Sequence, residues 1–403
     1  TVTDDLLEHG AERPNKIVVI SHHHTCETET LMYGELACWV DQFASALLAL
    51  GARHGEAVSF RLPNLWLFIA LHLACGPSGA VTNTILSIPC RREVSFICER
   101  LCSRVLVVPS AFRGFAHASM AAKVSTQVDT LEHVLAIGTY DNGLPPGVDD
   151  CDEHFVYPDW QGRHSAGDSA LLRTDPDSVA QAQFASGTTG EPKGAVHTCN
   201  TVYAGMRPSV DAVGLTSENL ALAFSQMAHT IGFSRGVTMP VAHGVVVLLQ
   251  ELWDPRTHLG LIRRCGVTWT KRAPPFIKDL CDIAKPGGTG ETLRRISCAA
   301  APIPPYLVHR VQDELRATIF AVWGMPEVGA VTSIWSSDEP LRAAETDGSA
   351  TGWNELAVLG PDGAELPGDT VGQLARTRPC RSGITAAQTC SPPRSTTRVV
   401  RHR

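Results

Sequence analysis

Short strand-like runs alternate with helix-like segments along most of the chain, and this alternation constrains the fold more than any other feature. Apolar runs of strand length lie at residues 57–62, 104–108, 133–137, 245–249, 267–270 and 318–322. Apolar residues at helical spacing lie between several of them, as at 65–75 and 305–315. Such alternation predicts a layered α/β fold with a mostly parallel sheet. Residues 141–175, rich in Pro, Gly and Asp, are predicted to be a loop and connector.

Composition excludes several classes of protein. The chain has 403 residues, of which 44% are hydrophobic and 19% charged, as in ordinary globular proteins. The net charge of −7 argues against nucleic acid as a partner. The longest apolar stretch, 237–249, is broken by Pro240, His243 and Gly244, so no membrane span is predicted. Thirteen Cys without a Cys-x-x-Cys pair fit a reducing compartment, and we expect a cytoplasmic protein.

The most specific motif is a glycine- and hydroxyl-rich string that ends in a lysine. It consists of Ser186, Gly187, Thr188, Thr189 and Gly190, followed by Glu191, Pro192 and Lys193. Glycines let the backbone approach a ligand closely, and turn N–H groups can form an anion-binding nest. A lysine adds a positive point charge suited to phosphate. The pattern predicts a phosphate-binding loop, although it is not a Walker A loop.

This loop and four later segments resemble the AMP-forming adenylating enzymes, which include acyl-CoA synthetases, peptide-synthetase adenylation domains and luciferases. In chain order, the segments are 224–229 with His229, 298–302 with Ala300, Ala301 and Pro302, 322–327 with Trp323, Gly324 and Glu327, and 363–374. Within that superfamily, the strings at 229–233 and 252–255 resemble bacterial acyl-CoA synthetases of the cyclohexanecarboxylate–CoA ligase type.

The resemblance implies the large N-terminal domain of the adenylate-forming fold, with layered, mostly parallel sheets, helices and a smaller β-rich subdomain. It also implies a ligase reaction with a small-molecule carboxylic acid, ATP and coenzyme A. Ser186, Gly187, Thr188, Thr189, Gly190 and Lys193 are then expected to hold phosphates, and Glu327 to bind Mg²⁺. Ala300, Ala301, Pro302, Trp323 and Gly324 are expected beside the adenine of ATP or AMP. His229 and Glu327 are the expected catalytic residues, with His229 beside the acid.

Two positions depart from the pattern of this superfamily. Pro326 stands where Thr or Ser usually precedes the Glu, which removes a hydroxyl and a backbone N–H and restricts φ. Ala300 stands where Gly is usual, which adds a methyl group close to the expected nucleotide. Both substitutions are expected to weaken ATP binding.

The resemblance ends at Leu374, and this position divides the chain into two predicted regions. Residues 1–374 are expected to be the AMP-binding large domain, incomplete at its C-terminal end. Residues 375–403 contain seven Arg and no Asp or Glu, and are expected to be an aberrant, disordered basic tail. The superfamily's small C-terminal domain, with its reacting-site Lys, is expected to be absent, so catalysis is expected to be impaired.

Three alternatives remain open at this stage. The chain could be a non-catalytic remnant that binds nucleotide or acyl groups, or a ligase that passes acyl-AMP to an acceptor other than coenzyme A. Separately, His22, His23 and His24 could bind zinc, but neighbouring His side chains point in different directions, so a solvated loop is the favoured interpretation.

The tail is hypothesised to be a shifted reading of the superfamily's own sequence. GC-rich codons for residues 398–403, read from the second nucleotide, give Gly-Trp-Phe-Ala-Thr, which resembles the superfamily's segment before its ribose-binding Asp. A one-base shift near codon 374 is therefore expected to restore Gly-Trp-Phe-x-Thr-Gly-Asp. Sequencing the coding DNA across codons 370–403 tests this, and the hypothesis fails if no single-base shift restores the motif.

Overall fold

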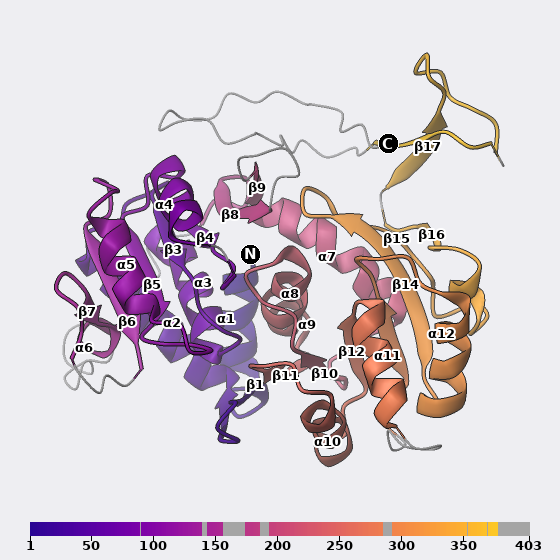
Figure 1. The fold of residues 1–403 in the computed structure, drawn as a ribbon, viewed down its shortest axis with the longest axis horizontal. Coiled ribbons are helices and arrows are strands. Elements are labelled where there is room, and N and C mark those ends of the chain that lie inside the picture. The colour runs from indigo at the N-terminus through magenta and orange to yellow at the C-terminus, as the bar shows by residue number, and fades with distance from the viewer. Residues whose placement is uncertain are drawn as a thin grey trace. The chain divides into compact units, whose positions relative to one another are not determined.

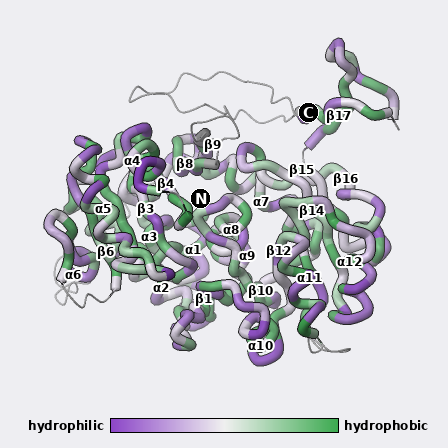
Figure 2. The backbone as a smooth tube through the Cα atoms, viewed as in Figure 1, coloured by the Kyte–Doolittle hydropathy of each residue, from purple (hydrophilic) through white to green (hydrophobic). Residues whose placement is uncertain are grey.

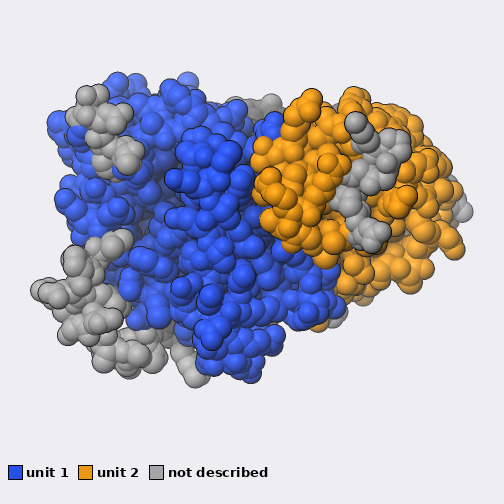
Figure 3. All heavy atoms as spheres, turned by 90° about the horizontal axis from the view of Figure 1, so that it is seen from below, with its two compact units in different colours: residues 1–202, 216–254, 386–392 blue, residues 203–215, 255–385, 393–403 orange. Residues whose placement is uncertain are grey.

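The computed structural model describes residues 1–88, 90–138, 143–155, 174–185, 193–284, 292–352, 354–368 and 370–377. They form two compact units (Figure 1, Figure 3). Among these residues, unit 1 comprises 1–202 and 216–254, and unit 2 comprises 203–215 and 255–377. Helix α7 (Cys199–Val213) begins in unit 1 and continues in unit 2.

Unit 1 contains a seven-stranded sheet with the strand order β7-β6-β5-β3-β4-β8-β9. The strands are β3 (Ala57–Phe60), β4 (Val81–Thr84), β5 (Val105–Pro109), β6 (His133–Ile137), β7 (Asp149–Asp150), β8 (Val179–Ala185) and β9 (Lys193–Thr198). All neighbours pair in parallel except β8 and β9, which are antiparallel. Every residue of β5 is buried, and its apolar run stands out along the strand (Figure 2). Such continuous burial is typical of parallel strands covered on both faces.

A second group of strands in unit 1 has the order β10-β11-β1-β2. These are β1 (Ile17–His22), β2 (Thr28–Met32), β10 (Leu220–Ala223) and β11 (Val246–Gln250), which are parallel except for the hairpin β1–β2. The helices of unit 1 are α1 (Val2–Glu12), α2 (Tyr33–Ala49), α3 (Trp66–Ser78), α4 (Arg91–Arg100), α5 (His117–Ser125), α6 (Cys151–Phe155), α8 (Thr230–Phe233), a π-helical turn (Ser234–Thr238) and α9 (Met239–His243).

Unit 2 has strands in the order β12-β13-β14-β15-β16 and a separate hairpin β17–β18. The strands are β12 (Trp269–Arg272), β13 (Arg295–Cys298), β14 (Thr318–Met325), β15 (Gly329–Ser333), β16 (Ser349–Ala350), β17 (Glu355–Leu359) and β18 (Gln373–Thr377). β12, β13 and β14 are parallel, and the remaining pairs are antiparallel. Its other helices are α10 (Pro255–Cys265), α11 (Pro274–Ile283), α12 (Pro305–Arg310), a π-helical turn (Val311–Leu315) and a 3₁₀ turn (Arg342–Ala344).

The α/β prediction with mostly parallel strands is confirmed. The six predicted strands correspond to β3, β5, β6, β11, β12 and β14, with β6 matching at both ends and no end differing by more than three residues. The predicted helices correspond to α3 and to α12 with the π-helical turn after it. The hairpin β17–β18 is the described part of the β-rich region, and β18 runs through the expected boundary at Leu374 to Thr377. Residues 378–403 of the predicted tail lie outside the described residues.

The loop predicted over 141–175 is wrong at residues 149–155, which form β7 and α6. The carboxylate of Asp150 accepts a hydrogen bond from the N–H of Asp152 at 2.9 Å, which supports the first turn of α6. Cys151 and Phe155 are buried, and the ring of Phe155 lies 4.7 Å from that of Phe43. A five-residue helix is too short to produce a period in the sequence. Residues 141, 142 and 156–173 of this prediction lie outside the described residues.

The solvated-loop interpretation of the three neighbouring histidines is wrong at His22, whereas His23 and His24 lie in the turn after β1. His22 is the last residue of β1 and is buried, with its ring hydrogen-bonded to the hydroxyl of Thr28 at 3.1 Å. The ring of His23 pairs with Glu29 at 3.0 Å, and the ring of His24 pairs with Glu251. Each ring thus has a different partner because the hairpin turns the three side chains apart. In the described part of the chain, no group of three His, Cys, Asp or Glu residues could hold a metal ion.

None of the described helices is both long and apolar enough to cross a membrane.

The buried strand β5 should carry a large share of the stability of unit 1. Leu106 is fully buried, so Leu106→Ala is expected to lower the free energy of unfolding by about 2–5 kcal/mol through lost burial and a cavity. Leu48 of α2 is 44% exposed, and Leu48→Ala is expected to change it by less than about 0.5 kcal/mol. Urea unfolding of both variants measures the difference, and equal losses would contradict this assignment of the core.

Candidate functional site

The predicted phosphate loop connects two paired strands of unit 1. β8 ends at Ala185 and β9 begins at Lys193, which is its register partner. The two ends of the loop therefore lie opposite one another at the carboxyl end of β8, the edge at which parallel sheets bind ligands. The structure does not describe the loop itself, Ser186, Gly187, Thr188, Thr189 and Gly190, nor the side chain of Lys193.

His229 lies beyond the carboxyl end of β10 and is the N-cap residue of α8. Its Nδ1 accepts a hydrogen bond from the N–H of Ile231 at 3.3 Å, which satisfies one of the unpaired donors of the first helical turn. Its side chain is exposed and so can be reached by a ligand. Capping thus sets the direction of the imidazole at the start of α8.

Glycine is required three residues further along α8. A Cβ on Gly232 would lie 2.1 Å from the carbonyl oxygen of Gln226, which no real Cβ contact allows. The helix therefore packs directly on the backbone of the segment that precedes His229. The next residue, Phe233, is buried, and its ring lies edge-on to that of His72 at 4.6 Å.

Asn64, which the sequence analysis missed, contacts the segment 224–229 from the loop after β3. Its Nδ2 donates to the carbonyl oxygens of Phe224 at 2.9 Å and Ser225 at 3.0 Å. Its Oδ1 accepts from the N–H of Met227 at 2.9 Å. The sequence did hold a signal for this residue, because Asn64 lies two residues after the predicted strand 57–62, where ligand-site residues commonly lie.

Two further missed residues contact the same region from β4, which is next to β3, and from β8, which is next to β4. Thr84, the last residue of β4, donates its hydroxyl to the carbonyl oxygen of Ala228 at 3.1 Å. Gln183 of β8 accepts from the hydroxyl of Thr230 at 2.7 Å. β3, β4 and β8 are neighbours in the sheet, so each of the three contributes a contact at one common edge. The contact to Gln183 also links the start of α8 to the strand that leads into the phosphate loop.

In unit 2, the predicted adenine-side segment leaves the sheet after β13. The last register pair of β13 and β14 is Cys298 with Ala321, so Ala300 departs where β14 continues toward Trp323. The segment is anchored by the N–H of Ala299, which donates to the carbonyl of Arg272 at 3.1 Å. Ala300, Ala301 and Pro302 are all exposed.

Ala300 has a φ of +75°, in the left-handed region. An L-residue with a Cβ pays about 1–2 kcal/mol there, whereas glycine does not. Alanine in place of the usual glycine at position 300 therefore strains the backbone, and it also adds a methyl group.

Trp323 and Gly324 lie near the end of β14, at the same edge of unit 2. Trp323 is half-buried and Gly324 is exposed. A Cβ on Gly324 would lie 2.1 Å from the carbonyl oxygen of Gly329 across the hairpin β14–β15, so only glycine fits. The glycine that follows the aromatic residue thus has a packing reason independent of any ligand.

Glu327 lies in the turn of that hairpin. The N–H of Val328 donates to the carbonyl of Met325 at 3.1 Å, which closes a β-turn with Pro326 and Glu327 at its centre. Proline suits the first central position of such a turn, since its φ is preset and no N–H is needed there. Pro326 therefore fits the backbone. The Glu327 carboxylate is half-buried and has no hydrogen bond or ion pair with any residue that the structure describes.

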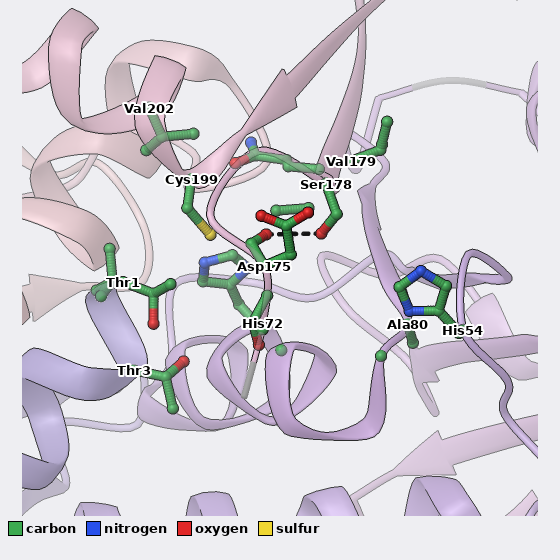
Figure 4. Close-up of a pocket in the computed structure, with 16 residues that line it drawn as sticks. Thr1, Thr3, His54, His72, Ala80, Asp175, Ser178, Val179, Cys199 and Val202 are labelled. Atoms are coloured by element: carbon green, nitrogen blue, oxygen red, sulfur yellow. Dashed lines mark hydrogen bonds between the residues drawn. The ribbon is translucent and has the colours of Figure 1, made fainter. Parts of the chain in front are cut away.

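A separate cavity of about 140 Å³ lies in unit 1, and none of the described residues predicted for the site lines it. Figure 4 shows His72, Cys199 and Asp175 among its lining residues, with the Ser178 hydroxyl donating to the Asp175 carbonyl at 2.8 Å. Burial lowers the pKa of His72 to about 3 and raises the pKa of the Cys199 thiol. Both groups are therefore neutral near pH 7, which argues against a nucleophilic thiolate.

The structure thus brings the predicted residues together in two groups. Unit 1 holds His229 and both ends of the phosphate loop, linked by the contact between Thr230 and Gln183. Unit 2 holds Ala300, Ala301, Pro302, Trp323, Gly324 and Glu327 around the end of β14. That Glu327 and the phosphate loop act on the same ligand stays a prediction.

Comparisons with known proteins agree on one family. The sequence profile described as AMP-binding enzyme matches residues 6–381. The medium-chain fatty-acid–CoA ligase of Escherichia coli (strain K12) is 25% identical over 368 residues, which is 91% of this chain and 62% of the relative. A 3-(7a-methyl-1,5-dioxo-octahydroindenyl)propanoyl:CoA ligase of Rhodococcus jostii (strain RHA1) is 25% identical over 89% of this chain and 69% of the relative.

A solved structure confirms the fold. The N-terminal domain of FACL13 from Mycobacterium tuberculosis superposes with a TM-score of 0.76 at 19% identity, covering 94% of this chain and 89% of that domain. The chain therefore spans about two thirds of the curated relatives above and most of this isolated domain. Since the profile match extends over nearly the whole sequence, the chain belongs to the family of AMP-binding enzymes.

Proposed function

We propose that the chain carries the nucleotide- and acid-binding part of a cytoplasmic AMP-forming acid–CoA ligase. A carboxylate oxygen of the acid attacks the α-phosphorus of ATP, and the bond to pyrophosphate breaks. The sulfur of coenzyme A then attacks the acyl carbon, AMP leaves and the thiol proton is released. The observation that carries this proposal is the family match over residues 6–381, which includes the whole glycine- and hydroxyl-rich string.

The phosphate loop supplies the charge compensation that the first step needs. The acid and ATP are both anionic, so the site must neutralise the phosphates as charge redistributes in the transition state. We assign this role to the N–H groups and hydroxyls of residues 186–190 and to the cation of Lys193. The register of β8 and β9 supports the assignment, because it places both ends of the loop at a ligand-binding edge.

Glu327 fits the requirements of a magnesium ligand. Mg²⁺ prefers carboxylate oxygens, and it is commonly bound by one or two carboxylates together with substrate phosphates. The Glu327 carboxylate is half-buried in a turn and is not committed to any partner in the described chain. When bound, the cation would supply charge stabilisation at the phosphates.

Trp323 and the segment 300–302 are assigned to the adenine of the nucleotide. They lie at one sheet edge in unit 2, where β13 ends and β14 continues. Trp323 offers an aromatic face, and the exposed backbone of 300–302 offers hydrogen-bonding groups.

His229 is assigned to the acid, and the acid is proposed to have an apolar aliphatic, alicyclic or aromatic body. Support comes from the neighbouring Ile231 in α8 and from the names of the two curated relatives, which specify a fatty acid and a ring-bearing propanoyl group. Two alternatives remain: a ligase that passes acyl-AMP to another acceptor, and a non-catalytic remnant that only binds its ligands. The experiment below distinguishes both from an acid–CoA ligase.

The proposal predicts exchange of labelled pyrophosphate into ATP that depends on an added carboxylic acid and on Mg²⁺. Glu327→Gln keeps the side-chain size but removes the charge, so the Mg²⁺ concentration for half-maximal exchange is expected to rise about 10-fold. Measuring initial exchange rates across a Mg²⁺ titration, with octanoate, cyclohexanecarboxylate and benzoate as acids, provides the readout.

Glu339→Gln is the matched control, since Glu339 is exposed and lies outside the proposed site. ATP binding by calorimetry without acid-dependent exchange would instead identify a non-catalytic remnant. In a version of the chain with the shifted reading frame restored, exchange that yields no acyl thioester with coenzyme A would indicate a different acceptor.

Ala300→Gly tests the strain at the adenine-side segment. Glycine adopts the left-handed conformation without the Cβ penalty, so the free energy of unfolding is expected to rise by up to about 1 kcal/mol. The dissociation constant for ATP is expected to fall because a methyl group is removed. Chemical unfolding and calorimetry measure the two effects, and a loss of stability on substitution would contradict the left-handed geometry at Ala300.

A further inference from the structure

We propose that Asn64 is a positioning residue for the acid, holding the segment 224–229 so that His229 and α8 are presented correctly. This inference rests on the proposed function, because it assigns His229 to the acid side. It adds a residue from a loop about 160 positions away in sequence, which no motif includes. Its side chain acts through the backbone of the segment and does not itself contact the reacting atoms.

The amide of Asn64 is committed at both ends. Nδ2 donates to the carbonyl oxygens of Phe224 at 2.9 Å and Ser225 at 3.0 Å, and lies 3.4 Å from that of Gln250 at the end of β11. Oδ1 accepts from the N–H of Met227 at 2.9 Å. One side chain thus joins the loop after β3 to the ends of β10 and β11, all within unit 1.

Only a primary amide of this length meets these requirements. A carboxylate could still accept the hydrogen bond from the N–H of Met227. It has no N–H to donate, so it would leave the carbonyl oxygens of Phe224 and Ser225 without a donor. A leucine, which shares only the branching of asparagine, would leave the carbonyls and the N–H without their partner. The side chain is 3% exposed, so water cannot readily replace it, and a buried unpaired polar group is costly.

The anchored backbone leads directly to His229. The N–H of His229 donates to the carbonyl of Gln226 at 2.9 Å, which closes a turn around Met227, the residue that Asn64 holds. Gly232 packs against the same Gln226 carbonyl. A shift of residues 225–227 would therefore displace both the imidazole and the first turn of α8. A misplacement of about 1 Å can cost roughly 100-fold in rate.

Asn83 provides a matched control for a purely structural role. It is a fully buried asparagine on β4, and its Nδ2 donates to the hydroxyl of Ser59 at 2.6 Å. It makes no described hydrogen bond to residues 224–229. Loss of a buried amide at either position should lower stability, but only the loss of Asn64 should loosen the segment.

Amide hydrogen exchange followed by mass spectrometry tests the contact without requiring turnover. In full-length Asn64→Leu and Asn64→Asp, exchange within peptides covering 224–231 is expected to accelerate about 10-fold. In Asn83→Leu, the same peptides are expected to exchange as in the unaltered chain. Unchanged protection in both Asn64 variants, or equal loss in Asn83→Leu, overturns the inference. Asn64→Asp keeps the side-chain shape and serves if the leucine variant does not fold.

Kinetics separate positioning from general damage. In the pyrophosphate exchange assay, kcat/KM for the acid is expected to fall about 10- to 100-fold in both Asn64 variants, while KM for ATP stays within about twofold. Asn83→Leu is expected to leave both parameters near the unaltered values. A parallel rise in KM for ATP contradicts a role on the acid side. If the unaltered chain shows no acid-dependent exchange, the proposed function fails, and the hydrogen-exchange result alone decides whether Asn64 holds the segment.

Discussion

Parallel pairing of short, buried strands is the constraint on which the rest of the structure depends. Because β3, β4 and β8 run in one direction, the residues after each strand meet at one edge of the sheet. Asn64, Thr84 and Gln183 reach the segment around His229 from that edge, and β8 continues into the phosphate loop. In unit 2, the parallel pair β13 and β14 brings the segment after Cys298 beside the end of β14 in the same way.

Close approaches between backbones determine which residues can occupy several site positions. Gly232 and Gly324 each lie against a carbonyl oxygen at a distance that no Cβ could tolerate. Their presence in recognisable strings therefore has a packing reason, and it need not reflect direct contact with a ligand. Ala300 is the opposite case, since a residue with a Cβ occupies a left-handed position where glycine would be unstrained.

The two departures from the family pattern look alike in sequence and differ in structure. Pro326 takes the first central position of a β-turn, where a fixed φ and a missing N–H cost nothing. Ala300 introduces strain because its φ is positive. Sequence comparison weighs both as substitutions of an expected residue. Only the backbone conformation distinguishes a tolerated change from a strained one.

The sequence by itself determined the kind of fold, the positions of six strands and two helices, and the order of the site segments. The fold class and the strand and helix positions depend on hydrophobic periods and turn residues, which are local properties of the chain. The order of the site segments came from the resemblance to the adenylating enzymes. Tertiary structure decided the rest. The short helix α6 has no readable period, and Asn64 meets Phe224 across 160 positions through hydrogen bonds that no local pattern encodes. Asn64 follows β3 and Phe224 follows β10, and these strands belong to different sheets, so their contact forms only when the folded chain brings the two sheets of unit 1 together.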